Sequence, residues 1–574
     1  MSSRPGSPGA APRSGLRRAL VLALDGATWD VAEPLMAAGR MPNLAALAAA
    51  GRRKPLPSTV PPMTFPAWSS FMTGVGPGRH GVFDFTQKEP GAYRVRFVHA
   101  GDRSGESLFA RVSAAGGRVL VLGMPACHPP EPVNGLLVSG FDAPVSTGSD
   151  PSRASDPALY RDIAARVGPW MTPDLAASDE PDTGAASAER AAFHERARAT
   201  LLARIARKRD FTLAALDALG AVELAVVVFA ESDTVAHHYW RDHDPHSPRH
   251  DPGAGDARKS AVVDVYTALD AACGEIRARF GADAACFVVS DHGAGGASRR
   301  VVHLNRFLAD AGLLARRRAA AGRIDGLARA ARDGVVRALP PRLAQWAFRR
   351  ARGAAARWES TVRFAGHDWA RTAAFSEETN TQPGVWINLR GREAEGSVAP
   401  ADYERVRTEL VDALLAWRLP GGGGPVVARA RPREEVYEGP FVERAPDVVV
   451  ELALEDGYAH SLVPTPWNRP ANGSVHTLAD AELAGARGQG MNGTHRPEGI
   501  WLASGDGSAS AANLASIVDA APAIARAMGV PWRLDAPDAG GDVGDRGPRG
   551  VAAPYTAEEE AQVAARLRAL GYIE

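Results

Sequence analysis

The sequence predicts an α/β fold with a mostly parallel central sheet flanked by helices. Short apolar runs of strand length, rich in valine and leucine, recur along the chain and end in turn or acidic residues. Alanine-rich stretches with helical periodicity lie between these runs. With 574 residues, the chain has room for one large α/β domain with insertions or for two to three domains.

The expected strands alternate with the expected helices along the chain. Each apolar run has the length of a strand buried on both faces, and the helices between the runs are long enough for parallel crossovers. The expected strands are Ala19–Leu24, Arg118–Leu122, Leu224–Ala230 and Ala284–Ser290, and the clearest expected helices are Met41–Ala50, Ala188–Ala206 and Ser260–Phe280.

Composition and charge exclude several classes of protein. The 66 basic and 66 acidic residues cancel, so the chain carries no overall signal for binding a nucleic-acid polymer. No apolar run reaches the roughly 18 residues of a membrane span, so we expect no transmembrane segment. The three cysteines, Cys127, Cys273 and Cys286, form no C-x-x-C pair. They are too few for a disulfide framework and favour a reducing compartment, the cytoplasm. The sequence leaves the oligomeric state open.

Changes in composition divide the chain into seven segments. The segment 311–370 is helical and basic, with thirteen arginines and four acidic residues. Two interpretations remain open for it: a surface that attracts anions, and a solvated helical cap, which we favour. We expect a disordered tail over 1–16, core parts over 17–149 and 221–310, a helical insertion over 150–220, the basic helical cap over 311–370, a third core part with a small α/β insertion over 371–505, and a C-terminal extension and helix over 506–574.

Three aspartates lie at or just after the ends of expected strands. Asp25 directly follows the first strand, Asp233 comes three residues after another, and Asp291 follows a third. Because the carboxyl ends of parallel strands meet at one edge of a sheet, we expect these carboxylates to gather there. Gathered carboxylates repel one another strongly unless cations lie between them.

Histidines accompany these aspartates. His237 lies four residues after Asp233, on the same face of a helical turn, and His292 directly follows Asp291. His495 lies in a glycine-containing loop near the end of the third core part. Imidazole and carboxylate ligands together favour Zn²⁺, with Mn²⁺ and iron as alternatives. Six such ligands are enough for two divalent metal ions with open positions.

Thr64 is the candidate nucleophile. It lies where a proline-rich loop turns into an expected helix, at the N-cap position, with Pro66 in the first turn. A hydroxyl there experiences the positive end of the helix, and nearby backbone N–H groups can face an anion. A threonine alcohol is a weak nucleophile at neutral pH, and coordination to a metal would activate it.

Taken together, these motifs resemble the alkaline phosphatase superfamily, specifically its type I phosphodiesterase/nucleotide pyrophosphatase family. The core resemblance covers roughly residues 19–135, 222–305 and 440–505. In chain order the matching pieces are Leu-Asp25-Gly, Thr64-Phe-Pro with Thr-Gly74 and Arg-His80-Gly, Asp233-x-x-x-His237, Ser-Asp291-His292-Gly and Gly-x-His495-Arg-Pro, with Tyr437-Glu-Gly-Pro and the final Leu570-Gly-Tyr-Ile-Glu574 also similar to bacterial members.

The resemblance implies an alkaline-phosphatase-like core with helical cap insertions and a hydrolase that uses two metal ions. One ion would be held by Asp233, His237 and His495, and the other by Asp25, Asp291 and His292. Thr64 would attack the phosphorus of a small phosphoester, giving a covalent phosphothreonine intermediate that water then hydrolyses.

One departure and several alternatives follow. Many nucleotide pyrophosphatases have an asparagine donor near the nucleophile, whereas Phe65, Pro66, Ala67 and Trp68 follow Thr64 here.

A phosphomutase, a phosphonate or phosphomonoester hydrolase and a sulfatase of the same superfamily remain alternatives, although the sulfatase pattern ends in an arginine that this sequence lacks. From a different class, the chain could be a binding module that keeps the fold. Taken singly, Thr64 could be a plain helix cap, Asp25 could cap a turn, and Asp233 and His237 could be an exposed pair on a helix.

Overall fold

A computed structural model describes most of the chain. The described residues are 15–143, 150–170, 187–317, 364, 366–378, 383–467, 473–483, 491–506, 514–533 and, near the C-terminus, 555–556, 559–560, 562–564 and 567. The expectations of a disordered tail and of a basic helical cap therefore lie almost entirely outside the described residues, as does much of the expected C-terminal extension.

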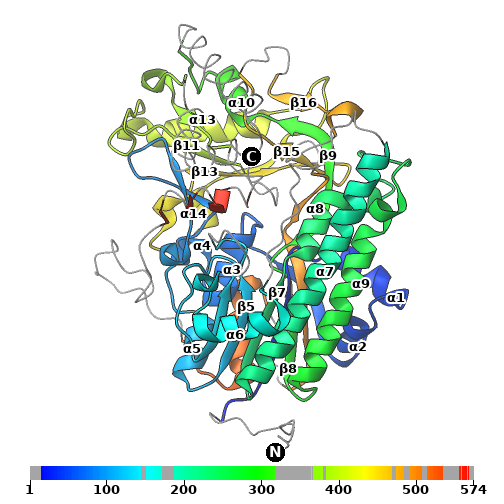
Figure 1. Cartoon of the computed structure of the whole chain (residues 1–574). Coiled ribbons are helices and arrows are strands. Elements are labelled where there is room, and N and C mark those ends of the chain that lie inside the picture. Colours follow the sequence, from blue (N-terminus) through cyan, green and yellow to red (C-terminus); the bar gives the residue numbers. More distant parts are fainter. Residues whose placement is uncertain are drawn as a thin grey trace, which may run out of the picture.

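A seven-stranded sheet forms the core in the lower half of Figure 1, with the strand order β2-β18-β8-β1-β7-β5-β6. The five strands from β8 to β6 run parallel, whereas β18 is antiparallel to both β8 and β2. The predicted α/β fold with a mostly parallel sheet is thus confirmed. The strands are β1 (Ala19–Leu24), β2 (Arg52–Pro57), β5 (Val119–Met124), β6 (Gly135–Ser139), β7 (Leu224–Phe229), β8 (Ala285–Val289) and β18 (Glu498–Ser504).

The central strands are apolar throughout because helices cover both faces of the sheet. Along β1, Leu20 and Leu22 pack into one core and Val21 into the other, as the alternation of side chains along a strand requires. One face is covered by α1 (Trp29–Ala37), α2 (Pro42–Ala50), α6 (Pro157–Val167), α7 (Ser187–Leu219), α8 (Glu231–His243) and α9 (Asp256–Phe280); the other is covered by α3 (Thr64–Thr73), α5 (Leu108–Ala114) and α15 (Ala520–Met528).

Two smaller sheets lie above the core in Figure 1, together with α10 and α13. The first small sheet has the order β10-β11-β13-β12, and the second is built around the long strand β9. Helix α13 is followed along the chain by strand β12. The bounds are β9 (Gly293–Val302), β10 (Ala374–Phe375), β11 (Gly384–Ile387), β12 (Val427–Pro432), β13 (Val448–Leu452), β14 (Leu454–Glu455), β15 (Tyr458–Leu462), β16 (Val475–Thr477), β17 (Gly493–Arg496), α10 (Leu304–Asp310), α13 (Tyr403–Ala416) and α14 (Arg433–Val436).

A short hairpin and helix complete the edge of the core that faces the small sheets. These are α4 (Pro77–His80), β3 (Thr86–Lys88) and β4 (Val95–Phe97). Among the described residues, no helix combines the length and the apolar character that crossing a bilayer requires.

Candidate metal centre

Three neighbouring strands deliver three aspartates to one place. The order β8-β1-β7 is parallel and in register, so the residues that follow these strands meet at the same edge of the sheet. Asp25 directly follows β1, Asp291 comes two residues after β8, and Asp233 is the third residue of α8, which begins just beyond β7. At most 1% of each aspartate is exposed.

Asp233 lies in one group with two histidines. His237 is one turn further along α8, and its Nε2 lies 3.2 Å from Asp233 Oδ1. His495 Nε2 lies 3.5 Å from the same oxygen and 3.0 Å from His237 Nε2. One ligand atom from each of the three residues falls within 4.8 Å of the others. We call Asp233, His237 and His495 the first triad.

Asp25, Asp291 and His292 form a second group of the same kind. His292 Nε2 lies 3.2 Å from Asp291 Oδ2 and 3.7 Å from Asp25 Oδ1. We call these three residues the second triad. The two triads touch, because the rings of His292 and His495 stack with centroids 3.8 Å apart.

Strand pairing brings the two triads together across 200 residues of sequence. Strand β9 begins directly after His292, and β17 pairs with it in antiparallel register, so that His495 lies opposite Ala294. The glycines along this stretch of β9 are required for close packing. A Cβ at Gly293 would lie 2.1 Å from the carbonyl oxygen of Glu498.

The three imidazoles are all oriented in the same way. Nδ1 of each ring donates to a backbone carbonyl: His237 to Gly493 at 2.9 Å, His292 to Gly293 at 3.1 Å and His495 to Pro62 at 2.9 Å. With the proton on Nδ1, the lone pair of Nε2 points into the centre. This arrangement is typical of histidines that bind metals.

The buried carboxylates of Asp25, Asp233 and Asp291 act on one another electrostatically. Burial and the neighbouring Asp233 raise the pKa of Asp25 to about 8, and burial together with Asp25 raises the pKa of Asp291 well above its usual value. Burial also acts on Asp233, but the adjacent His237 outweighs it and lowers the pKa of that carboxyl well below its usual value. Asp25 Oδ1 and Asp291 Oδ2 are buried, and no donor group among the described residues forms a hydrogen bond with them. The donor set therefore fits divalent cations, which would supply the missing positive charge.

Two supporting residues were missed by the sequence analysis. Trp68 Nε1 donates to Asp25 Oδ2 at 3.1 Å, and the backbone N–H of Gly26 donates to Asp291 Oδ1 at 3.2 Å. Gly26 has a φ of +64°, and a Cβ there would lie 2.7 Å from Asp233 Oδ1. The glycine in Leu-Asp25-Gly was a visible signal, whereas nothing in the sequence indicated that Trp68 faces Asp25.

Thr64 lies beside the second triad, but not as a helix cap. The prediction that it is the N-cap is wrong, since α3 begins at Thr64 and its N-cap is Met63, in an extended conformation. The Thr64 hydroxyl is therefore not used in capping, and its Oγ1 lies 3.4 Å from His292 Nε2. Thr64 is fully buried. The structure thus brings all seven candidate residues into one centre.

The N-terminus of α3 offers backbone donors at the same point. Pro66 has no N–H, and the N–H of Ala67 donates to the Met63 carbonyl at 3.0 Å. No described residue accepts a hydrogen bond from the N–H groups of Thr64 and Phe65. Two uncommitted donors at the positive end of a helix favour a bound anion.

Comparison with known proteins shows the family of this chain. A family model described as "Type I phosphodiesterase / nucleotide pyrophosphatase" matches residues 19–461, well over half of the chain. This chain belongs to that family. The members are hydrolases of phosphoric ester and anhydride bonds, so the predicted enzyme class and the predicted family are confirmed. His495 lies beyond the matched residues.

No curated protein matches this chain. Among solved structures, it is similar to a phosphonoacetate hydrolase from Sinorhizobium meliloti in complex with phosphonoformate, with 16% identity, 90% of this chain and 96% of the other covered, and a TM-score of 0.48. It is also similar to murine ectonucleotide pyrophosphatase/phosphodiesterase 5 in complex with AMP, with 11% identity, coverage of 90% and 95%, and a TM-score of 0.43. The human counterpart has 11% identity, with 90% of this chain and 96% of the other covered, and a TM-score of 0.43.

Proposed function

We propose that this family member hydrolyses phosphodiester or pyrophosphate bonds through Thr64, with two divalent cations held by the two triads. The observation that carries the proposal is the Thr64 hydroxyl, which lies 3.4 Å from a second-triad histidine, at the head of a helix with free N–H donors. The nitrogen and oxygen ligands favour Zn²⁺, with Mn²⁺ and iron as alternatives.

The cations would lower the pKa of a coordinated hydroxyl group or water molecule, and they would stabilise negative charge on the phosphoryl oxygens. His237, His292 and His495 would hold them through Nε2, and Asp25, Asp233 and Asp291 through their carboxylates. The backbone carbonyls at Gly493, Gly293 and Pro62 fix the rings in the tautomer that this requires.

Thr64 performs the covalent step. Its Oγ1 attacks phosphorus in line, a new P–O bond forms, and the bond to the leaving group breaks, releasing an alcohol or a phosphate. Water then cleaves the threonyl ester and restores the hydroxyl. The N–H groups of Thr64 and Phe65 face a phosphoryl oxygen, and we propose that they replace the asparagine donor that the sequence lacks.

The test compares four substrates. Bis-p-nitrophenyl phosphate is the diester, p-nitrophenyl phosphate the monoester and p-nitrophenyl sulfate the sulfate ester, with p-nitrophenyl phenylphosphonate added. We expect the diester to be hydrolysed with the highest kcat/KM. If the enzyme preferred the monoester, the sulfate ester or the phosphonate, its main activity would be hydrolysis of that substrate, and the proposed phosphodiesterase activity would be wrong.

The Thr64→Ala variant should lose about a thousandfold or more in kcat on the diester, because the nucleophile is gone. Thr73→Ala is the matched control. Thr73 is the last residue of α3, and its hydroxyl donates to the Ser69 carbonyl at 2.7 Å. Equal rates for the Thr64→Ala variant and the wild type would show that Thr64 is not the nucleophile.

A further inference from the structure

The short helix α4 lies between α3, which begins at Thr64, and the region of the small sheet of β10 to β13. In Figure 1 it is seen between α3 and α14. The stretch Arg-His80-Gly at the end of α4 and the stretch Tyr437-Glu-Gly-Pro after α14 have no role in the proposed function. We call residues 437–444, which begin with the second stretch, the docking segment. The structure brings these two stretches into contact.

The docking segment packs directly on the backbone of α4. The N–H of Phe441 donates to the Gly78 carbonyl at 2.9 Å. A Cβ at Gly78 would lie 2.6 Å from the carbonyl oxygen of Glu438, and a Cβ at Gly439 would lie even closer to the carbonyl oxygen of Gly78. The two backbones can therefore approach this closely only because both positions are glycine.

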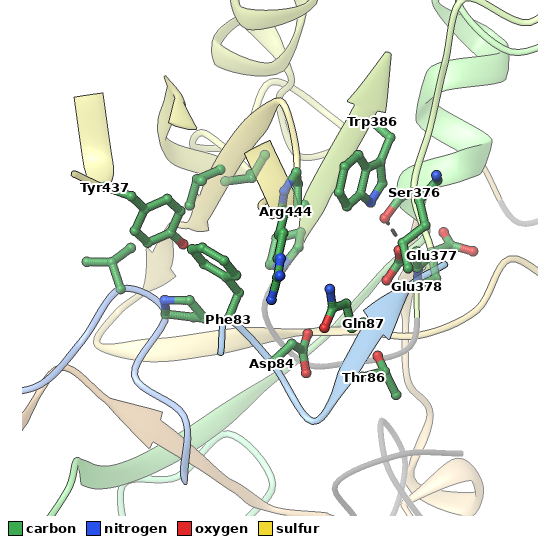
Figure 2. Close-up of a pocket in the computed structure, with 18 of the residues that line it drawn as sticks. Phe83, Asp84, Thr86, Gln87, Ser376, Glu377, Glu378, Trp386, Tyr437 and Arg444 are labelled. Atoms are coloured by element: carbon green, nitrogen blue, oxygen red, sulfur yellow. Dashed lines mark hydrogen bonds between the residues drawn. The ribbon is translucent and has the colours of Figure 1, made fainter. Parts of the chain in front are cut away.

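Aromatic packing holds the docking segment beside α4 as well. The rings of Phe83 and Tyr437 meet edge to face, with centroids 4.9 Å apart, and Figure 2 shows them side by side. Both rings belong to one cluster of buried side chains with Phe441. The partly buried Val60, four residues before Thr64, packs against this cluster. The docking segment is thus fixed to the core by apolar packing in addition to the backbone hydrogen bond.

His80 connects α4 to α3. The N–H of Val82 donates to His80 Nδ1 at 3.1 Å. Burial lowers the pKa of His80 to about 3, so the ring is neutral and its proton is on Nε2. Nε2 donates to the Ser70 hydroxyl of α3 at 2.9 Å. The ring also interacts with the carbonyl of Pro66, two residues after Thr64. The fully buried imidazole therefore joins the end of α4 to the first two turns of α3.

The path from the docking segment to Thr64 is short. Gly78, which the docking segment contacts, lies two residues before His80 in the same helix. A displacement of the docking segment therefore moves the imidazole and, through it, the start of α3. The position of that start matters for catalysis, because a misplacement of about 1 Å between reacting groups can slow a reaction about a hundredfold.

We propose that α4 couples the docking segment to α3 and that His80 is a positioning residue, which holds Thr64 in place beside the second triad. The inference rests on the proposed function for its effect on catalysis, but not for its effect on α3. None of the seven candidate site residues lies in the docking segment. The inference adds that this segment nevertheless sets the geometry of the nucleophile.

Gly78→Ala tests the contact between α4 and the docking segment. The added methyl group displaces the backbone at Glu438, so we expect kcat on bis-p-nitrophenyl phosphate to fall about tenfold. KM should change by less than about twofold, because the attack geometry changes and the groups that bind the substrate remain. Gly76→Ala is the matched control. A Cβ there would meet no atom of the described residues within 4 Å, and its φ of −80° suits alanine. This variant should keep the wild-type rate.

Two substitutions of His80 test the residue itself. A glutamine amide reaches as far as Nε2 and keeps a donor toward Ser70, whereas the shorter asparagine keeps only an acceptor toward the Val82 N–H. We therefore expect His80→Asn to lower kcat about tenfold and His80→Gln to recover most of the loss. Equal losses in both variants would show that the hydrogen bond to Ser70 does not position Thr64. If His80→Asn does not fold, Ser70→Ala removes the same hydrogen bond from the α3 side and should have the same effect.

The double variant Gly78→Ala/His80→Asn tests the coupling. If both residues act along one path, the double variant should be about as slow as the slower single variant. If the two losses in kcat multiply instead, the docking segment and His80 act independently, and the coupling is wrong.

Hydrogen–deuterium exchange separates this inference from the proposed function. The N–H of Ala67 donates to the Met63 carbonyl at 3.0 Å and reports on the first turn of α3. Gly78→Ala and His80→Asn should each speed exchange in this turn about tenfold, and Gly76→Ala should not. Unchanged exchange in Gly78→Ala would overturn the inference, whatever the rates of hydrolysis. Faster exchange with a wild-type rate on the diester would support the coupling and would contradict the proposed role of Thr64.

Discussion

Single side chains at the centre depend on neighbours that hold them in position. Aspartate and histidine side chains are common metal ligands, so the sequence predicted all six of them as ligands. It also predicted Thr64 as the nucleophile. Their supports are ordinary residues in unremarkable sequence positions. The indole of Trp68 is the example: it follows Thr64 by four residues, one turn along α3, and donates to Asp25 Oδ2 at 3.1 Å.

Trp68→Phe tests whether this support matters. The substitution keeps an aromatic ring in a fully buried position and removes only the N–H group that orients Asp25. We expect metal affinity to fall roughly tenfold, as is usual when a ligand loses a hydrogen bond from its surroundings. Competition with a chromophoric chelator measures the affinity. An affinity equal to that of the wild type would mean that the packing of Asp25 alone fixes its orientation.

At the scale of elements, local signals were predictable and long-range pairing was not. The apolar runs located β1, β5, β7 and β8 to within about two residues, because strands buried on both faces are apolar throughout. Nothing in the sequence showed that β17 pairs with β9, although this pairing places His495 beside His292. Register between segments 200 residues apart depends on packing.

The start of α8 relies on a buried ion pair. Lys208 of α7 places Nζ 2.8 Å from Oε1 of Glu231, the first residue of α8, and both side chains are almost completely buried. Lys208→Met should reduce the free energy of unfolding by about 3 kcal/mol, because it leaves a buried carboxylate unpaired. Urea denaturation measures the change. The double variant Lys208→Met/Glu231→Gln is the control and should recover part of the loss. Loss of less than about 1 kcal/mol in the single variant would show that this ion pair does not stabilise the start of α8.

At the scale of the whole molecule, a sheet edge brings together residues from opposite ends of the chain. Asp25 and His495 belong to one centre because β1, β7 and β8 are adjacent and because β9 and β17 extend from that edge. Parallel strand order explains why aspartates after separate strands meet, and this much followed from the sequence. The pairing within the small sheets did not, since most of their strands are short.

The central proposal is that each of the two triads holds one divalent cation. Metal analysis of the full-length protein by mass spectrometry, after zinc supplementation and removal of free metal, tests it most directly. The account predicts close to two equivalents per chain in the wild type, and close to one in both Asp291→Asn and His237→Gln, which each disable a different triad. A wild-type protein that retains no metal, or variants that retain as much as the wild type, would contradict it.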